Sequence, residues 1–169
     1  MPDLQRLTTE YVEAEDRIRI SGEVSTGGVA VFWLTQRLLN RLLPHLLGWL
    51  DRQGQAGEMG DLLQEFAQQA AMAAHAPEAP VVCQPESSPW LVMSVDITPS
   101  DAGMSLKFKS SEKGEGEAAG LTLDQGALRQ WLNILLGQYR QAEWPMSVWP
   151  EWMNVADRAA PSRPPMTLH

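Results

Sequence analysis

The chain has few of the residues that form disulfide bonds and metal sites. Its 169 residues include three histidines and one cysteine, Cys83, so no intrachain disulfide can form. The sequence contains no HExxH, CxxC, P-loop or GxSxG pattern. We therefore expect no catalytic residues of these types, no metal ion and no cofactor. A single reduced thiol favours a cytoplasmic protein.

Positive charge is also scarce. Thirteen Lys and Arg residues stand against 21 Asp and Glu, a formal net charge of −8. Such a balance repels phosphate backbones, so we do not expect nucleic acid among the partners. A weaker alternative is a basic patch on exposed strand faces, formed by Arg17, Arg19, Lys107 and Lys109. Residues 1–16 lack the basic and then apolar pattern of a secretion signal, which again favours the cytoplasm.

The longest apolar run, residues 29–50, is long enough to cross a bilayer. It contains Arg37 and Arg41, however, and central arginines are costly in lipid. Its period also changes at Thr35, from continuous apolar residues to leucines spaced three and four apart. Thr35 is a suitable N-cap, because its hydroxyl can accept a bond from a helix N–H. The run therefore predicts a buried strand that leads into an amphipathic helix, with no membrane span.

Alternating apolar and polar residues predict the other strands. We expect strands at 4–13 (an edge strand), 17–24, 29–34, 91–98, 104–109 and 119–123, with 81–83 as the weaker candidate for a seventh. In the strand at 91–98, Leu91, Met93, Val95 and Ile97 share one face. A Ser-Thr-Gly-Gly turn at 25–28 joins two of the strands as a hairpin.

Two further helices follow from apolar residues at helical spacing. One starts at Asp61 and has Leu62, Leu63, Phe66, Ala70 and Ala73 on one face; the other starts after Asp124, a second N-cap. The resulting fold class is α+β, an antiparallel sheet or sandwich of six to seven strands covered by three helices. We expect one domain at 1–142, with a helical insertion at about 59–75, and a Trp- and Pro-rich extension at 143–169.

The two halves of the chain share one order of elements. Three strands, the last ending in Leu-Thr (Leu34-Thr35 and Leu121-Thr122), precede a leucine-rich helix in each half. One interpretation is an internal β-β-β-α duplication. The other is that any two amphipathic helices align this well, and the sequence leaves both open.

The same order of elements, over residues 4–140, resembles the head domain of the DNA end-joining scaffold superfamily. The resemblance implies a non-catalytic domain that forms dimers and binds partner proteins. Two features depart from that family. No long heptad repeat follows Tyr139, and the chain has no basic tail that could hold DNA.

Pro44 and His45 lie inside the predicted leucine-rich helix. Proline there removes a hydrogen bond and favours a kink, which could open a pocket against the sheet near His45 and Arg41. A small-molecule-binding protein or enzyme with that pocket is our alternative hypothesis of function. The simpler interpretation is a histidine at the border of a core helix.

The segment at 143–153 (EWPMSVWPEWM) is too irregular to predict a helix and too apolar for a free tail. Trp144, Trp149 and Trp152 either close the chain's own core or form a docking strip for a protein partner or a second copy. We expect a non-enzymatic cytoplasmic interaction or assembly domain that self-associates as a dimer.

Overall fold

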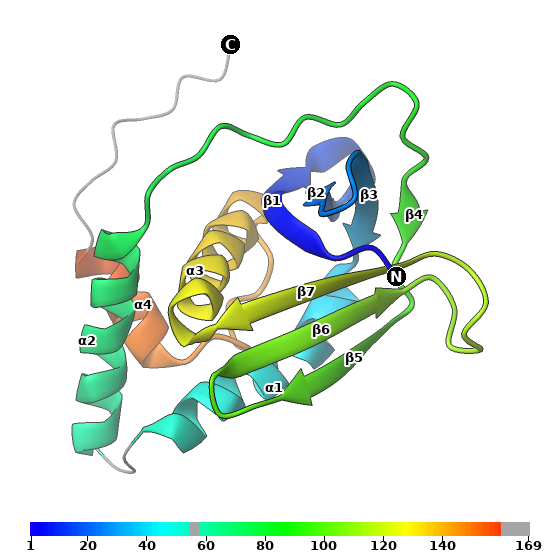
Figure 1. Cartoon of the computed structure of the whole chain (residues 1–169). Helices are drawn as coiled ribbons and strands as arrows, with labels where there is room; N and C mark the ends of the chain where they lie inside the picture. Colours follow the sequence, from blue (N-terminus) through cyan, green and yellow to red (C-terminus); the bar gives the residue numbers. More distant parts are fainter. Residues whose placement is uncertain (55–57, 160–169) are drawn as a thin grey trace.

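The computed structural model describes residues 1–54 and 58–159 and has an α+β fold (Figure 1). Its strands are β1 (Leu4–Val12), β2 (Arg17–Val24), β3 (Val29–Leu34), β4 (Trp90–Leu91), β5 (Ser94–Pro99), β6 (Gly103–Lys109) and β7 (Ala118–Asp124). Its helices are α1 (Gln36–Gln53), α2 (Glu58–Ala74), α3 (Gln125–Ala142) and α4 (Glu151–Ala159), and the 3-10 helix η1 (Glu13–Glu15) joins β1 to β2. The predicted class is confirmed, but the strands form two sheets and the described residues contain four α-helices instead of three.

The first sheet has the order β1-β2-β3-β4. Its first three strands are antiparallel, and β4 runs parallel to β3. The predicted strands at 17–24 and 29–34 are confirmed, and the strand predicted at 4–13 forms the edge strand β1. In the hairpin turn, Gly27 and Gly28 have φ angles of 99° and 88°, which glycine adopts without steric cost.

The second sheet is the antiparallel meander β5-β6-β7. Met104, Leu106 and Phe108 alternate inward along β6 as predicted. The strand predicted at 81–83 is absent from the segment between α2 and β4, all of which the structure describes. Prolines at 77, 80, 85 and 89 remove backbone donors from this segment.

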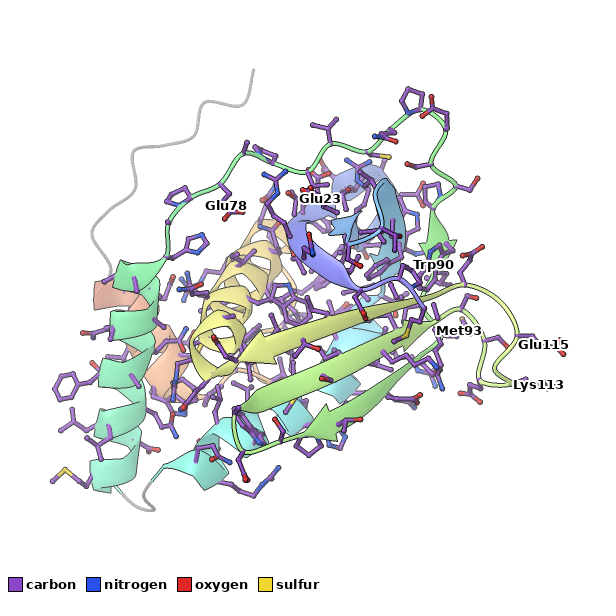
Figure 2. The ribbon with its side chains drawn as sticks, viewed as in Figure 1. Glu23, Glu78, Trp90, Met93, Lys113 and Glu115 are labelled. Carbon is purple, nitrogen blue, oxygen red and sulfur yellow. The ribbon has the colours of Figure 1, made fainter. Side chains whose placement is uncertain are left out.

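The strand predicted over 91–98 is in fact divided between the two sheets. Trp90–Leu91 pairs with β3, whereas Ser94–Pro99 pairs with β6. Between them, Val92 donates its N–H to the carbonyl of Trp33, and Met93 donates to the carbonyl of Lys109. Val92 is only 2% exposed and Met93 is 56% exposed (Trp90 and Met93 are labelled in Figure 2). The predicted alternation fails here because the chain changes sheets and shifts its inward face by one residue.

Both predicted N-caps are confirmed. The Thr35 hydroxyl accepts a hydrogen bond of 3.1 Å from the N–H of Leu38, and the Asp124 carboxylate accepts one of 2.7 Å from Ala127. Helix α1 runs through Pro44 as a single element. None of the described helices has both the length and the apolarity needed to cross a bilayer.

Helix α4 corrects the prediction that residues 143–153 are too irregular for a helix. The carbonyl of Pro150 accepts hydrogen bonds from Met153 at 3.1 Å and Asn154 at 3.4 Å. Proline is well tolerated just before a helix, because the first N–H groups of a helix have no partner within it. The irregular composition therefore ends at Pro150, and α4 begins at Glu151. Of the predicted extension at 143–169, residues 160–169 lie outside the described residues.

One core joins the two sheets and the helices α1 and α3. Its centre is aromatic: the ring of Phe108 on β6 lies 5.0 Å from that of Phe32 on β3 and 6.5 Å from that of Trp131 on α3. Helix α4 packs against α2, which stands at the outer edge of the molecule (Figure 1). The order of three antiparallel strands and a helix occurs twice, as β1-β2-β3-α1 and β5-β6-β7-α3. Whether this order arose by duplication stays a prediction.

Candidate interaction face

The three tryptophans predicted to bind a partner are buried in the core of their own chain. Trp144 and Trp149 contact Tyr139 edge to face, with ring centroids 5.1 and 5.3 Å apart. The indole N–H of Trp144 donates to the Asp16 carboxylate at 2.9 Å, and this bond lowers the pKa of Asp16. In this structure the segment closes its own core, so Trp144, Trp149 and Trp152 offer no free surface to a partner.

His45 and Arg41, the residues of the alternative pocket, are exposed on α1. They line neither of two wide cavities, of about 610 and 470 Å³, both of which lie along the segment between α2 and β4. Figure 1 shows this segment arching over the first sheet. Within residues 1–54 and 58–159, no three His, Cys, Asp or Glu side chains are grouped so as to hold a metal ion.

The larger cavity has an apolar floor formed by Leu123, Ala127, Trp131 and Ile134. Much of its polar rim holds the arching segment in place. Arg6 donates to the carbonyl of Ala79 at 2.8 Å and pairs with Glu23 at 2.9 Å (Glu23 and Glu78 are labelled in Figure 2). The Thr8 hydroxyl accepts a bond of 2.8 Å from Val81. These groups have a structural role that accounts for their positions without a ligand.

Helix α2 exposes large apolar side chains along one face. Met59, Leu62, Leu63 and Phe66 are 60%, 42%, 42% and 54% exposed. Their spacing of three, four and seven residues places them on one side of the helix, and the exposed Ala70 and Ala73 continue the row. We call these six residues the α2 face. Single exposed apolar residues are common, whereas a contiguous group of them marks a binding surface.

The opposite side of α2 packs on the protein through small residues and glutamines. Gly60 and Ala71 are buried, as are Gln64 and Gln68. Gln64 donates to the carbonyl of Leu50 on α1 at 2.8 Å, and Gln68 donates to the carbonyl of Arg129 on α3 at 2.8 Å. Because buried amides require such partners, these bonds set the rotation of α2 about its axis. That rotation leaves the α2 face in solvent.

Arg129 completes this contact from α3 and is only 4% exposed. Its guanidinium donates to the side-chain oxygens of Gln64 at 2.5 Å and Gln68 at 3.5 Å. It also lies over the ring of Trp152 on α4, with its Cζ atom 5.7 Å from the ring centroid. Burial lowers the pKa of Arg129, and the nearby charge of Asp51 opposes that shift. One buried arginine thus connects α2, α3 and α4.

Sequence reasoning identified most of the α2 face but not its exposure. Leu62, Leu63, Phe66, Ala70 and Ala73 were predicted to share a face, and the structure confirms that they do. Met59 was missed because the helix begins at Glu58, before the predicted start at Asp61. The exposure could have been inferred from the opposite face of the helix, which carries Gln64 and Gln68 together with small residues.

Comparison with protein-family models, with curated proteins and with solved structures found no match to this chain.

The burial of Trp149 leads to a stability prediction. Trp149→Ala removes a buried indole from the Tyr139 cluster, so we expect the free energy of unfolding to fall by about 3–5 kcal/mol. Phe66→Ala removes an exposed aromatic ring from α2 and should change it by less than about 1 kcal/mol. Urea denaturation of both variants measures the difference, and equal losses would contradict the packing described.

A second prediction concerns Arg129. Arg129→Ala leaves the side-chain oxygens of Gln64 and Gln68 without their buried donor, and we expect a loss of about 2–4 kcal/mol. Arg158, which is exposed and pairs with Glu151 at 2.9 Å, is the matched control. Arg158→Ala should cost less than about 1 kcal/mol in the same denaturation experiment. A small effect at both positions would show that the Arg129 contacts do not hold α2 in place.

Proposed function

We propose that this protein is a non-enzymatic interaction domain that binds another protein chain through the α2 face. The observation that carries the proposal is the exposure of Met59, Leu62, Leu63 and Phe66 on one side of one helix. Amphipathic helices often bind other proteins through apolar side chains at positions i, i+3, i+4 and i+7. Met59, Leu62, Leu63 and Phe66 have this spacing.

Energetics support the use of this face in binding. Each apolar Å² removed from water contributes about 25 cal/mol, and a few large side chains at the centre of an interface carry most of its binding energy. Their exposure is not forced by poor packing, since α2 is already anchored through Gln64, Gln68 and Arg129 on its other side. A partner can therefore cover the α2 face without unfolding or rotating the helix.

The other expectations fit this proposal to different degrees. Self-association through Trp144, Trp149 and Trp152 has little support, because these side chains are buried in their own chain. The resemblance to the end-joining scaffold head domain agrees with a non-catalytic platform and stays a prediction, as does ligand binding near His45. We retain the cytoplasm as the proposed compartment, because the lone Cys83 is a free thiol.

Site-specific photocrosslinking tests the proposal. A photoreactive residue at position 62 should give one discrete crosslinked species in cells of the source organism, to be identified by mass spectrometry. The double substitution Leu63→Gln and Phe66→Gln should abolish this product by making the face polar. Its melting temperature should change by less than about 3 °C, because both side chains are largely solvated.

The control is a photoreactive residue at position 82. Val82 is also exposed, but it lies in the segment between α2 and β4. It should give no product that depends on Leu63 and Phe66. Products that form equally at both positions, or that survive the double substitution, would contradict an interaction through the α2 face.

A further inference from the structure

We infer that the occupant of the α2 face is an amphipathic helix of another protein, with an apolar stripe bordered on one side by Lys or Arg. This inference rests on the proposed function and adds the chemistry of the partner. The α2 face runs from Met59 to Ala73, which at 1.5 Å per residue is about 21 Å. That length matches about four turns of a partner helix.

The charge next to the face selects the partner. Asp61 and Glu65 lie one turn apart on the flank of α2 between the apolar row and the buried glutamines, and Asp61 is exposed. Glu65, three residues after Leu62, adjoins the row directly, and we call this flank the acidic border. Residues 58–74 contain three acidic residues and no Lys, Arg or His. Asp61 also contributes to the raised pKa of Asp51, after the larger effect of burial, so Asp51 of α1 adds a third carboxylate near this border.

Within the part of the chain that the structure describes, the bases near α2 are largely engaged elsewhere. Arg129 is buried beneath the helix with Gln64 and Gln68. On α4 and the end of α3, Arg158 pairs with Glu151 and Arg140 pairs with Asp157. Arg52, at the end of α1, is exposed and partly offsets Asp51. The acidic border therefore favours basic side chains from the occupant, which would form charge pairs there.

A second copy of this chain fits the face less well. In an antiparallel pairing of two α2 helices about a two-fold axis, the acidic borders of both copies fall on the same side and repel each other. In a parallel pairing, each acidic border meets the opposite border of the other copy, which carries Ala67 and Ala74. Because α2 contains no Lys, Arg or His, neither arrangement pairs Asp61 or Glu65 with a base of the partner helix. An anionic membrane surface is disfavoured for the same reason, given the net charge of −8.

Two synthetic helical peptides test the inference with the full-length protein. Both have about 18 residues and the same leucine stripe; one carries lysines along one border, and the other carries glutamates there. At low salt the lysine peptide should bind about tenfold more tightly by fluorescence anisotropy, and high salt should remove most of the difference. The double substitution Leu63→Gln and Phe66→Gln should weaken its binding by at least about tenfold.

Charge reversal provides the sharper measurement. Asp61→Lys with Glu65→Lys should reverse the preference, so that the glutamate peptide binds more tightly. The matched control is Glu112→Lys with Glu115→Lys, which changes the net charge equally in a loop at the opposite end of the molecule from α2 (Glu115 in Figure 2). The control should keep the preference for the lysine peptide.

The remaining outcomes separate the two proposals. If both peptides bind equally and both lose affinity in the Leu63 and Phe66 variant, the face is an interaction site but the basic partner is wrong. A dimer in sedimentation equilibrium that this variant abolishes would identify a second copy as the occupant. Binding to anionic vesicles that the variant abolishes would identify a membrane surface. If neither peptide binds, the helical partner is wrong. If the Leu63 and Phe66 variant changes none of these measurements, the interaction face is wrong as well.

Discussion

The contact between Arg129 and the glutamines Gln64 and Gln68 determines how the outer part of this molecule is built. A buried guanidinium needs acceptors for its donors, and here the acceptors are side-chain amides on α2. Each amide then uses its own donor on a backbone carbonyl, Gln64 on Leu50 and Gln68 on Arg129. Because an unpartnered buried polar group is costly, this set of bonds permits one rotation of α2 and disfavours others.

That constraint reverses the usual arrangement of an amphipathic helix. Most surface helices bury their apolar stripe and expose polar residues, whereas α2 buries glutamines and small residues and exposes Leu62, Leu63 and Phe66. The contact between α2 and the rest of the protein is therefore stabilised by hydrogen bonds and by the close approach of small residues, and less by burial of large apolar side chains. The apolar side chains that remain in solvent form the surface that we propose binds a second protein, and the carboxylates of Asp61 and Glu65 lie on the adjoining flank of the helix.

The segment after α3 covers a different part of the core, around Tyr139. Tyr139 is fully buried on α3, and its hydroxyl donates to the side chain of Asn40 on α1 at 2.6 Å. Trp144 and Trp149 cover its ring edge to face, and α4 then places Trp152 against Arg129. The segment is thus part of the core, and it supports the far side of the network that orients α2.

Much of the fold follows from local patterns. The caps at Thr35 and Asp124, the alternation in β6, and the leucine stripes of α1 and α3 depend on near neighbours, and the structure confirms them. The change of sheet at Val92 and Met93 could not be predicted, because it depends on carbonyls of Trp33 and Lys109 in two different strands.

The same division holds for the candidate site. The sequence by itself determined that α2 has an apolar face, since helical spacing alone puts Leu62, Leu63 and Phe66 on one side. Only the tertiary structure decided that this face is exposed. The deciding bonds join Gln64 and Gln68 to Arg129, more than 60 residues further along the chain, and a helical period contains no information about which of two faces finds the better partner.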